Sequence, residues 1–152
     1  MTENGDLIRA SWHEAGHLVI ALHRQLRFGD LKSQNGRPTI TNFDLNQNHQ
    51  SVALFLVAGI AGERIQFNCH DEVGASSDLS MLHAISSKWP LPSEELLLKQ
   101  ATSILHHNMG ALTNLQDEIR SASQDSAFDL SPEPLLLDRF SIQEIWEKAL
   151  ER

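Results

Sequence analysis

The chain contains no tyrosine and almost no cysteine. Cys69 is its one cysteine among 152 residues, so an internal disulfide framework is excluded. The lack of tyrosine removes the phenol hydroxyl from the groups that could stabilise a charged transition state. Stability must therefore come from a hydrophobic core, and 41% hydrophobic residues in a chain of this length are enough to form one.

Positive charge and long apolar runs are also scarce. The 12 Lys and Arg are scattered and stand against 20 Asp and Glu, for a net charge of −8, which argues against a nucleic-acid partner. The longest apolar run, Val52 to Ala61, is too short to cross a bilayer. The N-terminal residues show no basic segment followed by an apolar one. We therefore expect no secretory signal, and a cytoplasmic protein with a single domain over residues 1–152.

The hydrophobic pattern predicts a mainly α protein with one small β-hairpin. Asn35-Gly36 is a two-residue hairpin-turn signal within 31–43, and Pro38 places its strand at a sheet edge because proline cannot donate to the ladder. Such an edge could hold an extended peptide by strand addition. The expected helices run over about 6–27, 49–67, from 76 or 77 to before 90, 93–120, and from 141 onward.

The segments between these helices are expected to lack regular structure. Residues 68–75 are predicted to form a loop, and 121–138 an irregular excursion. Gly110 is the position at which the fourth helix is expected to kink. Ser141 and Glu144 are predicted to form the capping box of the last helix.

The strongest chemical signal is His13-Glu14-Ala15-Gly16-His17, inside the first predicted helix. Four residues turn through about 400°, so His13 and His17 lie on one face, one turn apart. Both imidazoles can then reach one metal at about 2.0–2.1 Å, as zinc requires. Glu14 lies about 100° further round, where it can reach a water on the metal without binding the metal itself, and Gly16 leaves room beside the ion. The simpler interpretation is two solvated histidines on a helix face.

A catalytic zinc site needs a third protein ligand, and spacing leaves its identity open. His23 stands where the HExxHxxGxxH pattern puts a third histidine, but Ile20 replaces the turning glycine. On a continuing helix His23 points about 240° away from His17. Glu63, just after the apolar run, is more simply a hydrogen-bonded or ion-paired neighbour. Asp78 is equally well explained as an acidic residue in the first turn of a helix.

Three segments together resemble the zinc-peptidase domain of the FtsH-type ATP-dependent membrane proteases. They are His13 to His17, Ala58 to Arg64 (AGIAGER) and Gly74 to Leu79 (GASSDL). The resemblance implies a zincin-type helical peptidase domain with HExxH on the first long helix. It also implies that Zn²⁺ is bound by His13, His17 and Asp78, with Glu14 as the general base.

The residues around these ligands and the partners of the protein can also be predicted. Glu63 and His83 are the candidates for residues that lie around the ligands. The implied substrate is an unfolded polypeptide or peptide, and the implied assemblies are a homo-oligomer or a complex with a separate ATPase. The chain has no Walker-type Gly-x-x-x-x-Gly-Lys segment, so we expect ATP-independent cleavage. The alternative is a weakly active or inactive, metal-stabilised interaction module.

Overall fold

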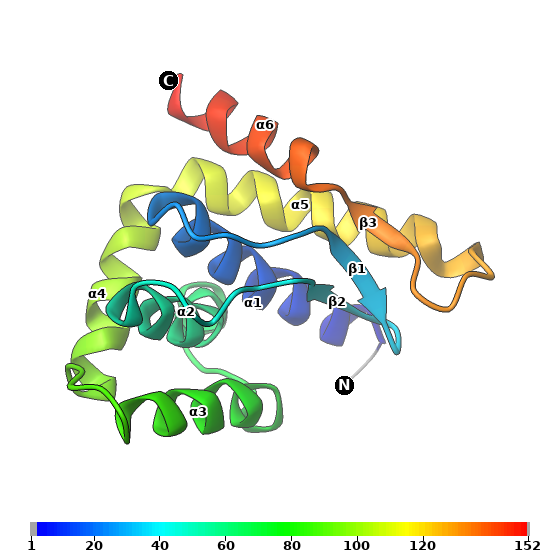
Figure 1. Cartoon of the computed structure of the whole chain (residues 1–152). Coiled ribbons are helices and arrows are strands. Elements are labelled where there is room, and N and C mark those ends of the chain that lie inside the picture. The colour runs from blue at the N-terminus through cyan, green and yellow to red at the C-terminus, as the bar shows by residue number, and fades with distance from the viewer. Residues whose placement is uncertain (1–2, 152) are drawn as a thin grey trace.

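The computed structural model describes residues 3–151. Outside the described residues lie Met1, Thr2 and Arg152. The first two belong to the N-terminal segment in which no secretory signal is predicted. The protein is mainly helical with a small antiparallel sheet, as expected (Figure 1). In chain order the elements are α1 Glu3–His23, β1 Leu31–Gln34, β2 Arg37–Ile40, α2 His49–Phe67, α3 Glu72–Ser86, α4 Glu94–His107, α5 Met109–Asp125, the 3-10 helix η1 Ser126–Phe128, β3 Leu135–Leu137 and α6 Arg139–Leu150.

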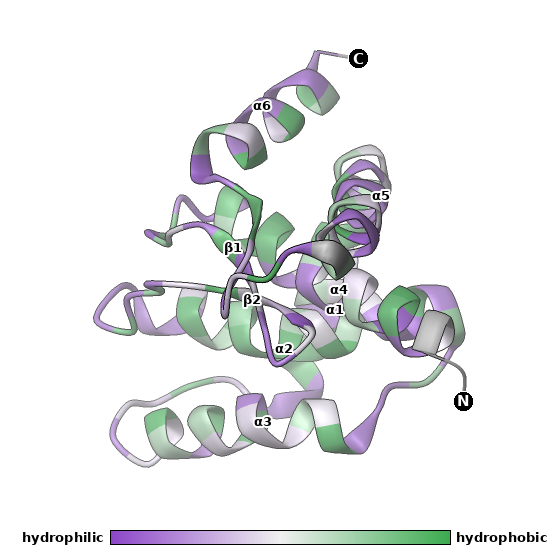
Figure 2. Cartoon of the chain, turned by 90° about the vertical axis from the view of Figure 1, so that its right-hand side faces the viewer, coloured by the Kyte–Doolittle hydropathy of each residue, from purple (hydrophilic) through white to green (hydrophobic). Residues whose placement is uncertain are grey.

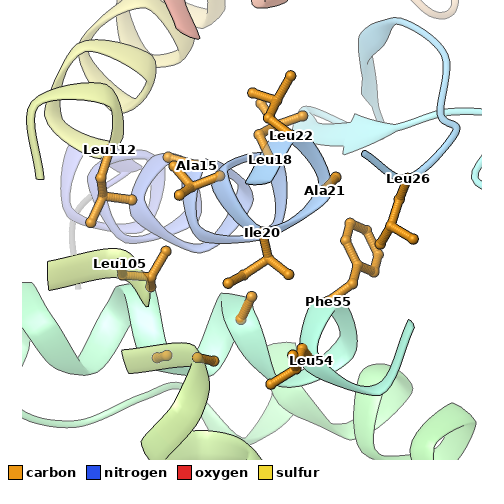
Figure 3. Packing of buried hydrophobic residues seen from close by; sticks show 14 of the residues in the cluster. Ala15, Leu18, Ile20, Ala21, Leu22, Leu26, Leu54, Phe55, Leu105 and Leu112 are labelled. Atoms are coloured by element: carbon orange, nitrogen blue, oxygen red, sulfur yellow. The ribbon is translucent and has the colours of Figure 1, made fainter. Parts of the chain in front are cut away.

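The core is built on α1 and α2, which pack against each other (Figure 3). The bounds of α2 are those that the sequence predicts, and residues 51–63 of this helix are all buried. Gly16 lies where the helices meet: a Cβ there would collide with the Ala58 carbonyl oxygen. Its role is therefore close helix packing, which corrects the expectation that Gly16 leaves room beside a metal.

The predicted hairpin is confirmed, but it belongs to a larger sheet. Asn35 and Gly36 have φ of 53° and 77°, which is the type I′ turn that joins β1 to β2. The strand order is β2-β1-β3, so β2, which contains Pro38, is an edge strand as predicted. The third strand was not predicted. Residues 121–138 were expected to be irregular, yet α5 continues to Asp125 and β3 pairs with β1.

The first helix ends earlier than predicted because of a backbone motif at its C-terminus. Gln25 adopts a left-handed conformation with φ of 55°. The Leu26 N–H donates to the Ala21 carbonyl at 2.8 Å, and the Gln25 N–H donates to the Leu22 carbonyl at 3.2 Å. This is the Schellman pattern, which glycine usually supplies, so the sequence pointed to Gly29 instead. Leu26 is buried although it lies outside the helix.

The third helix begins earlier than predicted, at Glu72 rather than at Ser76 or Ser77. The Asp71 side chain caps it by accepting from the Val73 N–H at 3.1 Å. Residues 68–75 are therefore only partly loop. Asp78 consequently lies in the second turn, and because the helix dipole acts mainly within the first turn, the dipole does not explain an acid at this position.

Two further helix boundaries differ from the expectation. The predicted fourth helix is two helices, α4 and α5, which meet at Asn108 and not at Gly110. The Asn108 side chain donates to the Ile104 carbonyl at 2.8 Å, a local bond that competes with continued helix. The last helix is capped by Asp138, which accepts from the Ser141 N–H at 2.7 Å, so Ser141 is not the cap.

Both hydrophobic and hydrophilic residues occur along α5 and α6 (Figure 2). The buried residues of α5 recur every three or four positions, as the hydrophobic face of an amphipathic helix requires. The buried face of α5 carries Leu112, Leu115 and Ile119. Within residues 3–151, none of the helices combines the length and the hydropathy of a membrane-spanning segment.

Candidate metal centre

Three side-chain atoms from two helices meet at one point. His13 Nε2 and His17 Nε2, from consecutive turns of α1, are 3.1 Å apart. Asp78 Oδ2, from α3, lies 3.1 Å from each of them. Both histidines are nearly fully buried, and the Asp78 side chain is 20% exposed. The three residues implied by the family resemblance are thus brought together.

In each imidazole, the hydrogen bond made by Nδ1 fixes the direction in which Nε2 points. His17 Nδ1 lies 2.6 Å from the Phe55 carbonyl oxygen, which can only accept, so Nδ1 carries the proton. His13 Nδ1 lies 2.6 Å from Glu63 Oε2 and donates to it in the same way. In the neutral rings both Nε2 atoms then present lone pairs to a carboxylate oxygen. One cation would satisfy all three atoms at once.

Glu63 is held in place by more than His13. Its Oε1 accepts from Arg9 Nη1 at 3.1 Å and from the Asp71 N–H at 3.2 Å. Burial alone would raise the pKa of Glu63, but the hydrogen bond and charge of His13, together with the hydrogen bonds from Asp71 and Arg9, hold that pKa below its ordinary value. A carboxylate that orients a ligating imidazole is a common feature around protein-bound metals. Glu63 thus lies behind His13, and its carboxylate is not one of the three converging donors.

The same contacts shift the titration of the converging groups. Burial lowers the pKa of His13, but hydrogen bonds to Asp78 and Glu63 outweigh it and raise that pKa to about 10. Burial raises the pKa of Asp78, whereas the charge of His17 and hydrogen bonds to both histidines bring it well below the ordinary value. A proton on His13 therefore relieves the crowded lone pairs when no cation is bound.

Two carboxylates compete for the position of third ligand. One carboxylate oxygen of Glu14 also lies within 4.8 Å of the two imidazole nitrogens. Asp78 Oδ2 is the closer, at 3.1 Å from both, and tetrahedral zinc ligands lie about 3.3 Å apart for bonds of about 2.0–2.1 Å. The arrangement therefore fits a metal held by His13, His17 and Asp78, with Glu14 beside it.

Glu14 is available to handle a proton. Among residues 3–151 no side chain or backbone group forms a hydrogen bond or ion pair with its carboxylate. Burial raises the pKa of Glu14 above the ordinary glutamate value, although the charges of His17, His13 and Arg37 lower it. A carboxylate with a raised pKa can accept a proton and release it again near neutral pH.

Gly59 on α2 leaves the space in which the two imidazoles lie. A Cβ at Gly59 would overlap the His13 ring and lie 2.6 Å from His17 Nε2. We expect Gly59→Ala to push both rings away from Asp78 and to remove most metal binding. The fold should lose about 1–3 kcal/mol, as other overpacked sites do. Metal content after gel filtration, together with thermal unfolding, measures both effects.

Gly110→Ala is the matched control for that substitution. A Cβ on Gly110, in the first turn of α5, would meet no atom within 4 Å. This variant should bind metal normally and gain up to about 1 kcal/mol of stability. Full metal binding by Gly59→Ala would show that the imidazoles do not need the space above Gly59.

Two other residues considered from the sequence lie away from the cluster. The His83 side chain is 71% exposed, and its Nε2 lies 3.8 Å from Glu94 on α4. His23 is the exposed last residue of α1. The structure therefore does not bring His83 or His23 to the site.

Sequence reasoning missed three contributors to the site. The Phe55 carbonyl is a backbone group and leaves no signal in the sequence. Gly59 did leave a signal in the sequence, because a glycine inside a buried helix marks a place where another group packs closely against the helix backbone. Arg9 lies one turn before His13, and only its contact with Glu63 shows its role.

The cluster contains the groups that metal-assisted hydrolysis needs: three converging donors and a carboxylate that is free to move a proton. Comparison with known proteins adds nothing to this picture, since no protein-family model and no curated protein matches the chain.

Proposed function

We propose that this protein is a zinc-dependent peptidase that hydrolyses peptide bonds in unfolded proteins or peptides. The observation that carries the proposal is the triangle of His13, His17 and Asp78 donor atoms with 3.1 Å sides. Beside it lies the Glu14 carboxylate, which forms no hydrogen bond or ion pair within the described part of the chain. Two imidazoles and one carboxylate are a donor set that suits catalytic zinc, which keeps its fourth position open.

The proposed roles follow from what each side chain can donate or accept. A bound zinc ion would supply Lewis acidity and lower the pKa of a water in its open position. Glu14 takes one proton from the attacking water and transfers it to the nitrogen of the departing amine. The hydroxyl is added to the carbonyl carbon and the C–N bond breaks, so atoms and charge balance. Glu63 and the Phe55 carbonyl keep the imidazoles oriented throughout.

The free edge of β2 is where we propose that the substrate binds. In a two-residue hairpin the residues that flank the turn bond to each other, so Arg37 and Thr39 direct their backbone groups toward β1. The Thr41 N–H donates to the Asp30 carbonyl at 2.9 Å, so every second residue from Arg37 to Thr41 directs its backbone groups to the β1 side. Pro38 then offers its carbonyl outward, and Ile40 both its N–H and its carbonyl. These groups can pair with an extended segment, which compact folded proteins seldom offer.

The proposal predicts zinc-dependent cleavage of disordered polypeptides and almost none of compact domains. A disordered protein and a stable domain are each incubated with the full chain, with and without ATP and with a chelator. We expect the chelator to stop cleavage and ATP to change nothing, since the chain has no Walker-type segment. Gel analysis over time measures the rates.

Two outcomes would contradict parts of the proposal. Equal cleavage of the disordered protein and the folded domain would contradict binding by strand addition. No cleavage of either, with zinc fully bound, would favour the metal-stabilised interaction module, for which a separate ATPase is the proposed partner.

A further inference from the structure

Arg37, the first residue of β2, extends toward the site. Gly74 lies in the first turn of α3, and Arg37 Nη2 is 3.8 Å from the point that a Cβ on Gly74 would occupy. The start of α3 and the β1–β2 hairpin lie at the same end of the molecule in Figure 1. The Arg37 charge also acts on Glu14, the proposed general base. Arg37 therefore links the edge strand to the helix that carries Asp78.

Arg37, like Arg24, Arg64 and Arg139, forms no ion pair with an acidic side chain among residues 3–151. Arg27 pairs with Asp44 at 2.6 Å, and Arg120 pairs with Asp117 at 2.8 Å. Asp71 lies near Arg37, since Asp71 Oδ2 is 3.6 Å from the point that a Cβ on Gly74 would occupy. Asp71 caps α3, however, and makes no ion pair with Arg37. The exposed guanidinium can thus pair with a carboxylate from another molecule.

Most acidic groups around the site have a positive partner of their own. Glu63 is balanced by Arg9, which binds it at 3.1 Å. The two positive charges of a bound zinc ion would balance Glu14 and Asp78, because the ligating imidazoles are neutral. Arg37 and the nearby Asp71 are then the remaining charges beside the start of α3, and Arg37 is the cationic one in a chain whose net charge is −8. A local positive charge attracts carboxylates that the rest of the surface repels.

We propose that Arg37 binds an acidic side chain of the substrate, so that the peptidase prefers polypeptides with Asp or Glu next to the segment held by β2. This inference rests on the proposed function, and it specifies the substrate class. An extended substrate on the free edge of β2 runs past Arg37, within reach of its guanidinium. Planar guanidinium groups bind carboxylates with two parallel hydrogen bonds, which lysine cannot do.

The test is a binding experiment with the zinc-loaded full chain that carries Glu14→Gln, which prevents turnover. Three fluorescent, unstructured peptides of equal length have Glu, Gln or Lys at the central positions, and anisotropy gives their dissociation constants. We expect the Glu peptide to bind about fivefold more tightly than the Gln peptide, as one exposed ion pair allows. Arg37→Gln should abolish this preference, and Arg37→Glu should reverse it in favour of Lys.

Arg120→Gln is the matched control, because it removes the same charge from α5 at a site paired with Asp117. It should keep the preference for Glu. An unchanged preference in both Arg37 variants, with zinc content equal to that of the parent, would overturn the inference. So would failure of the parent to distinguish the Glu from the Lys peptide.

Turnover by the chain with Glu14 intact separates this inference from the proposed function. Cleavage that is insensitive to Arg37, with no binding preference, contradicts the acidic substrate class alone. An Arg37-dependent preference for Glu without any cleavage supports the acidic ligand and contradicts the peptidase.

Discussion

Replacing Asp78 with alanine is expected to abolish stoichiometric zinc binding, whereas the unmodified chain should hold about one zinc ion. The substitution removes the oxygen that lies 3.1 Å from both imidazole nitrogens and leaves two ligands where a catalytic site needs three. The affinity should fall by more than about 100-fold, the upper range for loss of a residue that merely supports a ligand. His13→Ala and His17→Ala should have the same effect. Metal analysis after gel filtration measures the loss.

Glu72→Ala is the control for Asp78→Ala, because Glu72 lies on the same helix with an 83% exposed side chain and carries the same charge. It should leave zinc content unchanged. Glu63→Ala should weaken binding by about 10–100-fold and lower stability, since the buried His13 and the half-buried Arg9 lose their shared partner. Full zinc content in Asp78→Ala together with loss in Glu63→Ala would show that the ligand assignment is wrong.

Glu14→Gln is expected to keep zinc but to lose most hydrolysis. Glutamine has nearly the same size and can hydrogen-bond, but it cannot accept the proton of the attacking water. The rate on a disordered substrate should fall by about 10²–10⁴, the usual contribution of a general base. Initial rates at matched zinc content measure the effect.

The Glu118→Gln variant tests whether the result is specific to position 14. Glu118 is exposed on α5, so the same change of carboxylate to amide there should leave the cleavage rate unchanged. Zinc content is the second readout. Near-normal turnover by Glu14→Gln would exclude Glu14 as the general base, and loss of zinc from it would mean that Glu14 is a ligand.

Features encoded within one element were predictable from the sequence. The apolar run of α2 and the Asn35-Gly36 turn placed α2 and the hairpin correctly, because side-chain burial and positive φ act over a few residues. The spacing of His13 and His17 likewise placed both imidazoles on one face of a helix. Boundaries set by backbone bonds, such as the left-handed Gln25 at the end of α1, left no distinctive residue to read.

The sequence by itself determined two of the three converging donors, since both lie on one helix whose period is known. Spacing left the third donor open, although the family resemblance implied Asp78, because Asp78 and Glu63 come from different helices and spacing along the chain does not measure distance across the core. Only the tertiary structure brought the Asp78 carboxylate to both imidazoles. Packing of α2 on α1 put Glu63 behind His13, and α3 brings Asp78 to both histidines. The absence of a side chain on Gly59 left the room that these rings occupy.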